Sequence, residues 1–299
     1  MKKINFLDPS IKRKSELTEK NFQFLKNSKS PLPSEVEISE SGVCNRKCSF
    51  CPRSASDFKE VKEFISPKLH CKLIDELKNE NYQGVVRYSG FVEPLLDKNI
   101  FSLISEVSAK LPLARSEIVT NGDVLNRIRL KKLFKAGLST LLISVYDGPE
   151  DAIKFEKMCL EENLKPSQYV IRHRYYSKEK DFGLTISNRA GMMENAEFKI
   201  NALKEPLKEK CFYPSYTFFM DYNGDVLMCA HDWGKKRILG NLNKSSFTEL
   251  WTSNYTKISR SMLISGNRSI SPCNICDVNG TLIGKKHVDA WKIKYEKKK

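Results

Sequence analysis

The sequence contains no apolar run approaching the ~20 residues that cross a bilayer, and its longest runs, such as 141–145, have the length of a strand. The N-terminus carries lysines but neither an apolar segment nor a cleavage site of small residues, so we predict no signal peptide. We find no internal repeat of solenoid period and no known DNA-binding motif beside the basic residues. These absences lead us to expect a cytoplasmic protein that binds neither a membrane nor nucleic acid.

The composition is that of an ordinary globular protein, with 40% hydrophobic and 29% charged residues. A chain of 299 residues suits one large domain, or a domain with a smaller partner domain. The formal net charge is +15, spread along the chain and dense only at residues 292–299. A solvated lysine-rich surface is the simplest interpretation. If the charge attracts a ligand, we favour an anionic metabolite over nucleic acid.

Cysteine is the most informative residue type. Nine cysteines in a chain without a signal peptide argue against a disulfide framework, because thiols stay reduced in the cytoplasm. Cys71 and Cys159 stand alone in helical patterns, and we expect both to be small buried hydrophobic residues. The other seven form a group of three and a group of four: Cys44, Cys48 and Cys51, and then Cys211, Cys229, Cys273 and Cys276.

Short runs rich in Val, Ile, Leu and Tyr alternate with helical patterns after residue 33. The runs predict six strands: Glu35–Ser41, Val85–Ser89, Ser116–Thr120, Thr140–Tyr146, Tyr169–Tyr175 and Leu184–Ser187. Strands that alternate with helices favour a parallel α/β sheet or barrel. Ligands of such folds bind at the carboxyl ends of the strands, and the group of three cysteines directly follows the first predicted strand.

Two of the helical patterns carry signals for their ends. At 66–81, Ser66 can cap the helix and Pro67 can take its first position. At 126–137, Gly137 suits the left-handed residue that ends a helix. The residues expected to face the sheet are Leu69, Leu73, Ile74 and Leu77 in the first helix, and Ile128, Leu130, Leu133 and Phe134 in the second.

The pattern changes after the stretch Asn-Arg-Ala-Gly at 188–191. Two extended runs joined by Asn223-Gly224 predict a hairpin, and a helix is predicted at 246–255. The first 33 residues are polar and contain one short predicted helix, Ser15–Leu25. The predicted division of the chain is therefore an N-terminal extension at 1–33, an α/β core at 34–207 and a small C-terminal hairpin-plus-helix domain at 208–299.

The two cysteine groups differ in what they can bind. Four thiolates suit a closed tetrahedral metal site, and the spacing of the second group fits zinc and an iron–sulfur cluster equally well. Three cysteines in one loop can hold three irons of a four-iron cluster and leave the fourth iron open to another ligand. The alternatives for the first group are a zinc site with a distant fourth ligand, or coincidence.

The spacing Cys-x3-Cys-x2-Cys, with the aromatic residue Phe50 before the last cysteine, resembles the radical SAM superfamily. The resemblance implies a partial (β/α)6 barrel and a [4Fe–4S] cluster on Cys44, Cys48 and Cys51. It also implies that the open iron binds S-adenosylmethionine, whose reductive cleavage gives a 5′-deoxyadenosyl radical that abstracts a hydrogen atom from the substrate. Phe50 is expected to lie beside this site.

Further positions match the family one at a time. The stretch Ser-Gly-Phe-Val-Glu-Pro resembles a family motif that contacts the methionine moiety through Gly90 and Glu93, although Val92 replaces the usual glycine. The stretch Val-Thr-Asn-Gly supplies Asn121 at the end of the third predicted strand. Ser144 in the fourth strand matches a polar residue that reaches the cofactor. We therefore count these four matching residues among the cofactor-binding candidates.

The fifth predicted strand carries two arginines on one face. Because side chains alternate along a strand, Arg172 and Arg174 point to the same side as Val170. In a barrel of this kind we expect the polar face to line the lumen, where an inward Arg172 would bind a carboxylate of the cofactor through two hydrogen bonds. The alternative is a pair of surface arginines at the end of a strand.

The C-terminal part resembles the auxiliary-cluster domain called twitch, a shortened relative of the SPASM domain. The match consists of Cys211-x12-Gly224-x4-Cys229 followed by Cys273-x2-Cys276. Because no cysteine follows this pair, the resemblance implies one auxiliary [4Fe–4S] cluster on these four thiolates, and it favours iron–sulfur over zinc.

Two clusters suit a redox-balanced reaction, since an alcohol carbon that loses a hydrogen atom becomes a carbonyl by losing one more electron and a proton. A single auxiliary cluster is similar to the layout in family members that oxidise a ring hydroxyl of an aminocyclitol. We expect a sugar, cyclitol or nucleotide sugar as substrate and flavodoxin or ferredoxin as electron donor. The candidate catalytic side chains are Arg172, Arg174, Tyr88, Tyr146 and His231, with arginine orienting or stabilising an alkoxide because it rarely loses its proton.

Two other functions stay open. A peptide or protein maturase of the SPASM type often carries a leader-binding domain, and the predicted extension at 1–33 is too short for one. A non-catalytic iron–sulfur electron-transfer protein would need no open iron, so the three-cysteine loop argues against it.

Overall fold

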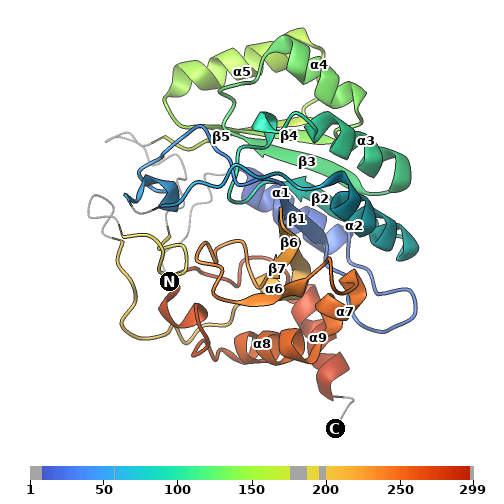
Figure 1. The fold of residues 1–299 in the computed structure, drawn as a ribbon, viewed down its shortest axis with the longest axis vertical. Helices are drawn as coiled ribbons and strands as arrows, with labels where there is room; N and C mark the ends of the chain where they lie inside the picture. The colour runs from blue at the N-terminus through green and yellow to red at the C-terminus, as the bar shows by residue number, and fades with distance from the viewer. Residues whose placement is uncertain (1–8, 57, 176–186, 195–199, 297–299) are drawn as a thin grey trace.

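One curved sheet runs through the part of the chain that the computed structural model describes, residues 9–56, 58–175, 187–194 and 200–296. In these residues the strand order is β5-β4-β3-β2-β1-β6-β7-β8 (Figure 1). The strands are β1 (Glu35–Ser39), β2 (Val85–Tyr88), β3 (Arg115–Thr120), β4 (Thr140–Val145), β5 (Tyr169–His173), β6 (Thr217–Asp221), β7 (Asp225–Leu227) and β8 (Ile238–Asn241).

Helices α2 to α5 each follow one of the first four strands and lie outside the sheet (Figure 1). Single turns of 3-10 helix occur at Pro52–Ser54, Pro94–Leu96 and Cys273–Ile275. Among the described residues, no helix is both long enough and apolar enough to span a bilayer. The helices are α1 (Pro9–Lys20), α2 (Pro67–Asn79), α3 (Ile100–Lys110), α4 (Arg127–Lys135), α5 (Pro149–Glu161), α6 (Tyr213–Tyr216), α7 (Phe247–Thr252), α8 (Asn254–Ser265) and α9 (Lys285–Glu296).

The first five strands pair in parallel and in chain order, which confirms the predicted α/β fold with a parallel sheet. Of the sixth predicted strand, 184–187, residues 184–186 lie outside the described residues. On its other side β1 pairs in parallel with β6, the first strand of the predicted hairpin, with Val36 opposite Phe218. Strands β7 and β8 continue the sheet in antiparallel pairing. The C-terminal hairpin therefore extends the barrel sheet.

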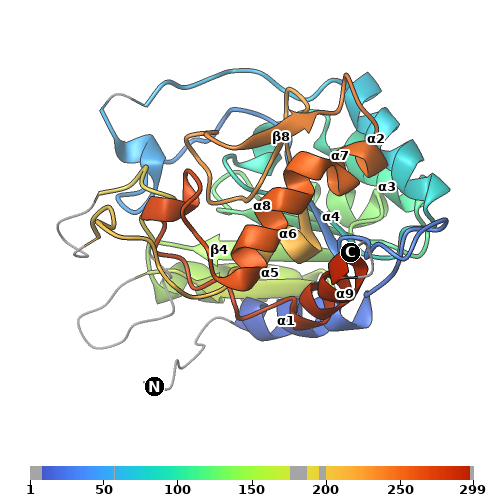
Figure 2. The same cartoon turned by 90° about the horizontal axis from the view of Figure 1, so that it is seen from below.

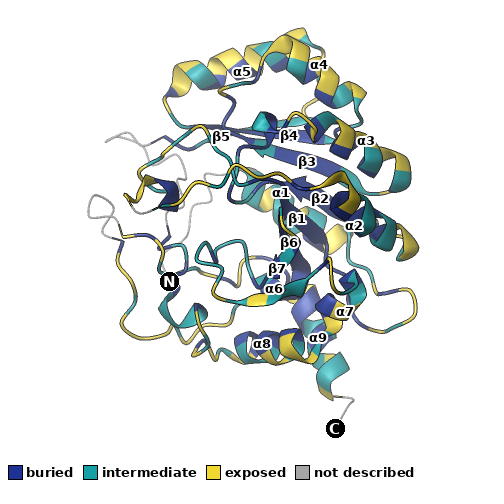
Figure 3. Ribbon diagram, viewed as in Figure 1, coloured by how far each residue is buried: buried dark blue, intermediate teal, exposed yellow. Residues whose placement is uncertain are grey.

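The two faces of the sheet differ in polarity. The outer face meets the helices through apolar side chains such as Val36, Ile118 and Ile143, each 0% exposed. Figure 3 shows these strands as buried and much of the outer surface of α4 and α5 as exposed. Because side chains alternate along a strand, the neighbouring residues face inward. The polar residues of this inner face include Glu35, Glu37, Arg87, Ser89, Glu117, Thr140, Ser144 and Arg172.

Helix α2 has the predicted start and the predicted apolar face. The Ser66 side chain accepts a hydrogen bond from the backbone N–H of Leu69 at 3.1 Å, and Pro67 takes the first helical position. The four residues expected to face the sheet are all buried. The local signals and the apolar periodicity therefore agree for this helix.

Helix α4 confirms part of its prediction. Gly137 adopts the left-handed conformation, with φ of 98°, just after the helix. Leu130 and Leu133 are fully buried, but Ile128 is 68% exposed. The prediction for Ile128 is wrong. Residue 128 precedes the buried Leu130 by two positions, and this spacing puts the two side chains on different faces of the helix.

The N-terminal helix begins earlier and ends earlier than predicted, since α1 spans Pro9–Lys20 and the expected range was Ser15–Leu25. The chain beyond α1 turns back on itself, with Phe24 paired to Pro31 in an isolated bridge. Arg13 of α1 contacts Glu117, and the Lys14 Nζ lies 3.0 Å from Glu35 Oε1. Helix α1 therefore packs against the amino ends of the strands, on the inner face of the sheet.

Three helices near the C-terminus surround one buried arginine. Arg260 of α8 is fully buried, and its guanidinium lies 4.3 Å from the Trp251 ring and 3.9 Å from the Trp291 ring. Trp251 belongs to α7 and Trp291 to α9, and helices α7, α8 and α9 lie near one another in both views (Figures 1 and 2). Helix α9 was not predicted, because its lysines mask an apolar face formed by Val288 and Trp291.

Candidate functional site

The loop with the first three cysteines follows β1 at the carboxyl edge of the sheet. Cys44, Cys48 and Cys51 are free thiols of intermediate exposure. The backbone N–H of Cys51 donates to the carbonyl of Cys48 at 2.9 Å, which closes a tight turn. The buried Arg53 guanidinium donates at 2.7 Å to the carbonyls of Gly42 and Phe91. The turn and the arginine hold the three thiols in one loop.

Burial raises the pKa of all three thiols, and the pKa of Cys48 rises to about 11. The negative charge of Cys51 raises the pKa of Cys48 further, because the two sulfurs are close enough to repel as thiolates. Three neighbouring thiolates in a partly buried site need a positively charged partner. A metal ion supplies it, and it lowers the pKa of each thiol by binding the thiolate directly. The donor set therefore fits an iron–sulfur cluster.

Polar contacts tie this loop to the ends of β3 and β4. The Arg46 guanidinium donates to Asp123, at 2.8 Å from Nε, and to Asp147, at 2.9 Å from Nη1. The Asn45 amide donates to Asp123 at 2.6 Å, and the Asn121 amide donates to Asn45 Oδ1 at 2.9 Å. Each bridge joins the cysteine loop to the carboxyl end of a parallel strand.

Several predicted cofactor-binding residues meet beside this loop. The Phe50 ring lies 5.4 Å from the Tyr146 ring, and burial raises the pKa of Tyr146. The Arg172 guanidinium donates to Ser144 Oγ at 3.2 Å, in the register where β4 pairs with β5. Arg174 is 9% exposed and its positive charge acts on Tyr146. The structure thus brings together the predicted residues of β4, β5 and the cysteine loop.

Glu93 lies at the expected place in the chain but is 2% exposed. Its carboxylate accepts hydrogen bonds from Thr120 Oγ1 at 2.6 Å, from Asn121 N–H at 2.6 Å and from Leu95 N–H at 3.0 Å. Burial raises its pKa, although these donors act in the opposite direction. In the structure Glu93 therefore ties the loop after β2 to the end of β3.

Gly90 directly precedes this loop in a left-handed conformation, with φ of 104°. A Cβ added here would lie 2.9 Å from the Phe219 ring, closer than real side chains approach. A larger residue at position 90 would therefore meet both backbone strain and a steric clash.

The structure separates the catalytic candidates. Tyr88 is fully buried on the outer face of the sheet, where its hydroxyl lies 2.8 Å from His70 Nε2, so it is not brought together with the others. Tyr146, Arg172 and Arg174 face inward beside the first cysteine loop. His231 lies at the second cysteine group instead, where its backbone N–H is 3.4 Å from Cys229 Sγ.

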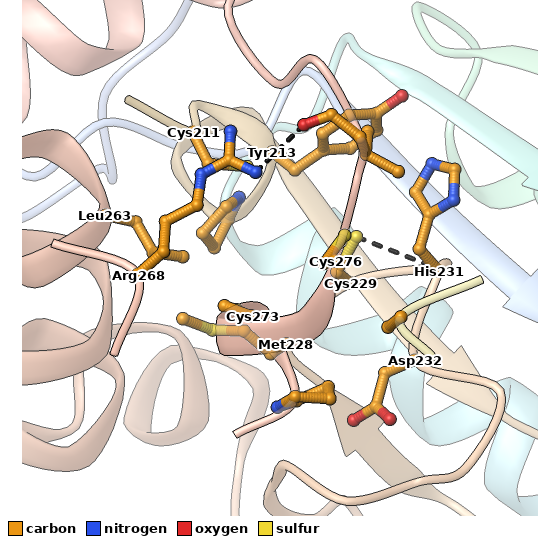
Figure 4. A pocket seen from close by; sticks show the side chains of 14 residues that line it. Cys211, Tyr213, Met228, Cys229, His231, Asp232, Leu263, Arg268, Cys273 and Cys276 are labelled. Atoms are coloured by element: carbon orange, nitrogen blue, oxygen red, sulfur yellow. Dashed lines mark hydrogen bonds between the residues drawn. The ribbon is translucent and has the colours of Figure 1, made fainter. Parts of the chain in front are cut away.

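The four cysteines of the second group line one small cavity together with Tyr213, Met228 and Arg268. Figure 4 shows Cys211, Cys229, Cys273 and Cys276 around it, with Arg268 on one side and His231 on the other. Arg268 donates to the carbonyls of Glu209, Lys210 and Val278 at 2.8–3.0 Å and so fixes the wall beside the cysteines.

Burial raises the pKa of each of these four thiols, and negative charges on neighbouring cysteines raise the pKa of Cys229, Cys273 and Cys276 further. Burial also lowers the pKa of His231 to about 3, with Arg189 and Lys14 adding to the effect, so this imidazole is neutral. Four converging thiols in an apolar cavity fit a fully ligated iron–sulfur cluster, and nothing in their chemistry conflicts with one.

We predict that Gly280→Val removes the metal from this second group alone. A Cβ at position 280 would lie 2.4 Å from Cys211 Sγ and 2.9 Å from its Cα, so the side chain would displace that ligand. The expected result is a fall in iron content by about half, with S-adenosylmethionine cleavage retained, measured by iron analysis and 5′-deoxyadenosine formation. Full iron content in this variant would contradict the assignment. Gly234→Val is the control, because the three atoms nearest an added Cβ there belong to the side chains of Met192 and Lys236 and not to a cysteine.

Several residues that shape the site were not predicted from the sequence. Arg46, Arg53 and Arg268 fix the two cysteine loops, but isolated arginines carry no spacing signal that distinguishes them from surface residues. The one available hint was the position of Arg46 within the first cysteine loop.

Comparison with known proteins agrees with this geometry. The chain matches a family model described as the radical SAM superfamily at residues 38–175, and one described as an iron–sulfur cluster-binding domain, SPASM, at residues 211–277. The S-adenosyl-L-methionine-dependent 2-deoxy-scyllo-inosamine dehydrogenase of Niallia circulans is 29% identical over 247 residues, which are 82% of this chain and 93% of that protein.

Two solved structures share the fold. The crystal structure of BtrN in complex with AdoMet and 2-DOIA has a TM-score of 0.71 and 26% identity, covering 87% of this chain and 98% of that one. The crystal structure of SeMet BtrN in an open conformation has a TM-score of 0.61 and 22% identity, covering 86% of this chain and 97% of that one. The likeness spans the barrel and the C-terminal part together.

Proposed function

This chain belongs to the radical SAM superfamily, and from that membership we propose that it oxidises a ring hydroxyl of a cyclitol, or of a related sugar or nucleotide sugar, to a ketone. The chain is an oxidoreductase that uses S-adenosylmethionine and two [4Fe–4S] clusters. The substrate class is the proposed part.

The similarity to BtrN bound to AdoMet and 2-DOIA carries this proposal, because it covers 98% of that chain. The dehydrogenase from Niallia circulans supports the same substrate class, since its name specifies a cyclitol amine and 93% of its length is matched. The cavity with four cysteines adds support, because alcohol oxidation must dispose of a second electron.

We assign the S-adenosylmethionine-binding cluster to Cys44, Cys48 and Cys51, and the auxiliary cluster to Cys211, Cys229, Cys273 and Cys276. When bound, the cofactor and clusters supply the abstraction of a hydrogen atom from the alcohol carbon and take up the electron released as the carbonyl forms. The apolar walls of the second cavity exclude water from this electron acceptor.

The chain's own side chains orient the reactants. Phe50 and Asn121 lie at the cysteine loop, and Ser144 accepts a hydrogen bond from Arg172 at 3.2 Å, which supports our proposal that these residues contact the cofactor. Gly90 and Glu93 shape the loop that follows β2. We propose that Tyr146 and Arg174 contact the substrate oxygen, with Arg174 as a fixed positive charge.

We also propose the cell compartment, the electron donor and the functional division of the chain. All nine thiols are free, which suits a reducing cytoplasm. A flavodoxin or ferredoxin would supply the electron for S-adenosylmethionine cleavage. We retain 1–33, 34–207 and 208–299 as the functional division, with β6 joining the last part to the barrel sheet.

The test is incubation of the anaerobically reconstituted enzyme with S-adenosylmethionine, a reductant and candidate aminocyclitols, sugars and nucleotide sugars. We expect about eight irons per chain, 5′-deoxyadenosine, and a product lighter than its substrate by two hydrogens. A substrate deuterated at the carbinol carbon should pass deuterium to 5′-deoxyadenosine. Ketone formation from no candidate, with cross-linking of a peptide substrate instead, would contradict the proposal and indicate a maturase.

A further inference from the structure

Strand β8 and helix α8 carry a group of exposed apolar side chains. Ile238 is 40% exposed on β8, and Tyr255 and Ile258 are 45% and 57% exposed on α8. Arg237 joins the strand to the helix, because its guanidinium donates to Ser259 Oγ at 2.7 Å and lies 4.7 Å from the Tyr255 ring. We call the surface made by Arg237, Ile238, Tyr255 and Ile258 the β8–α8 patch. Exposed apolar side chains that gather in this way mark interaction sites.

The β8–α8 patch lies on the outer side of the wall of the second cysteine cavity. Met228 and Leu263 line that cavity (Figure 4). The Met228 N–H donates to the carbonyl of Arg237 at 3.1 Å, and the Leu263 carbonyl on α8 accepts from the N–H of Cys211 at 3.0 Å. A single layer of backbone, made of α8 and the chain at β7 and β8, therefore separates the patch from the second cysteine group.

The chain around this patch is strongly basic. Residues 233–276 contain a single acidic residue, Glu249, and the acidic residue that precedes them, Asp232, is buried. The same segment contains seven basic residues: Lys235, Lys236, Arg237, Lys244, Lys257, Arg260 and Arg268. Arg260 and Arg268 are buried, whereas Lys236, directly before the patch, is exposed. An apolar centre with a basic rim is complementary to an acidic protein.

The apolar centre of the patch also decides which kind of anionic partner fits. Nucleic acid is held mainly through polar contacts to its phosphates and sugars, and Ile238 and Ile258 can make none. Flavodoxins are small acidic proteins. Electron-transfer proteins bind through small interfaces, below about 1,200 Å², so a patch of a few side chains suffices for one of them.

We propose that the β8–α8 patch docks an acidic flavodoxin, which takes up the second electron of the oxidation from the second cysteine group. The inference rests on the proposed function, because that oxidation removes two electrons from the alcohol carbon. One leaves with the abstracted hydrogen atom, and the other is released with a proton as the carbonyl forms. The oxidised flavodoxin gains this second electron and is reduced by one, which leaves the second group ready for the next turnover.

Zero-length cross-linking locates the docking site. The holoenzyme is mixed with oxidised flavodoxin and a carbodiimide, which joins lysine amines to carboxylates in contact with them. We expect the main cross-link at Lys236 or Lys257, identified by peptide mass spectrometry, and its loss at high salt, because salt screens surface charges. A main cross-link at a lysine outside residues 235–257, or no cross-link, would overturn the proposed surface.

The double variant Lys236→Glu/Ile258→Asp tests the affinity, since it reverses one charge at the rim and places a carboxylate in the apolar centre. We expect the Kd for oxidised flavodoxin to rise at least about tenfold, measured by isothermal titration calorimetry, with unchanged iron content. The matched control is Lys157→Glu/Leu160→Asp, at exposed positions on α5, which lies across the molecule from α8 (Figure 1). Equal Kd values for the two double variants would overturn the proposal.

Electron transfer is measured without substrate or S-adenosylmethionine, so its outcome does not depend on the proposed reaction. Chemically reduced holoenzyme, freed of the reductant, is mixed with oxidised flavodoxin and freeze-quenched. The electron paramagnetic resonance signal of the auxiliary cluster should disappear at least about tenfold more slowly in Lys236→Glu/Ile258→Asp than in the wild type. Equal rates would overturn the proposed electron route. Docking at the patch in a wild-type enzyme that makes no ketone would overturn only the proposed function.

Discussion

Replacing Cys48 by alanine is expected to lower 5′-deoxyadenosine formation by at least about a thousandfold, as removal of one essential member of a catalytic unit does. The loop has three thiols and no fourth ligand of its own, so the loss of one leaves two thiolates to hold the S-adenosylmethionine-binding cluster. Iron content should fall from about eight to about four per chain. The measurements are iron analysis and chromatography of the S-adenosylmethionine cleavage products.

Cys71 supplies the matched control, since its thiol lies on α2 beside Lys110 and far from either group in the fold. Cys71→Ala should retain full iron content and full cleavage activity. Cleavage at the wild-type rate in Cys48→Ala would show that the first group does not hold the S-adenosylmethionine-binding cluster.

The second large effect is on stability, where Arg87→Met is expected to lower the free energy of unfolding by about 3–5 kcal/mol. Arg87 is 6% exposed on the inner face, with Nη1 2.7 Å from Glu35 Oε1 and Nη2 2.8 Å from Glu117 Oε2. Removing it leaves two buried carboxylates that Lys14 and Arg13 only partly neutralise. Anaerobic urea denaturation of the reconstituted protein, followed by circular dichroism, measures the loss.

The pH dependence of this effect has a definite sign. Burial opposes the ionisation of Glu117, but Arg87 and Arg13 outweigh it and lower its pKa from 4.5 to about 2. Its stabilising contribution is therefore present above about pH 4.5 and is lost as the pH falls from 4.5 toward 2. In Arg87→Met the carboxyl pKa should rise, so the destabilisation should be larger at pH 8 than at pH 5.5.

Arg115→Met is the control for this second prediction. Arg115 also approaches Glu117, but at 3.9 Å and with a side chain 36% exposed, so its removal should change the free energy of unfolding by less than about 1 kcal/mol. Equal losses of unfolding free energy in the two variants would show that the buried ion pairs of Arg87 stabilise the fold no more than the partly exposed Arg115 does.

The parts of the fold that followed from the sequence are those with a local physical cause. Ser66 marks the start of α2 because its side chain accepts a hydrogen bond from a free N–H of the first turn, and Pro67 suits the first position because it has no N–H to satisfy. Gly137 marks the end of α4 because it accepts positive φ. Both cysteine groups were found because metal ligation demands fixed spacings. The alternation Val170, Arg172, Arg174 correctly placed Arg172 on the inner face of the sheet, where its guanidinium donates to Ser144.

The parts that escaped prediction depend on residues far apart in the chain. Nothing near Phe218 indicates that β6 pairs with β1, because the partner is set by the whole sheet. Tyr88 was a catalytic candidate by its position in the second predicted strand, yet its side-chain parity directs it outward to His70. Asn188 was passed over for a similar reason, since its partner Asp277 lies in a distant loop.

The parallel pairing of β1 with β6 also constrains how the chain is made. Strand β1 lies near the start of the chain, and its partner β6 emerges about 180 residues later. At roughly 5–20 residues per second, a ribosome leaves that edge of β1 unpaired for roughly 10–40 s. Until then, the backbone groups of β1 form an open template for wrong partners. The nascent barrel is therefore open to mispairing at this edge until β6 arrives.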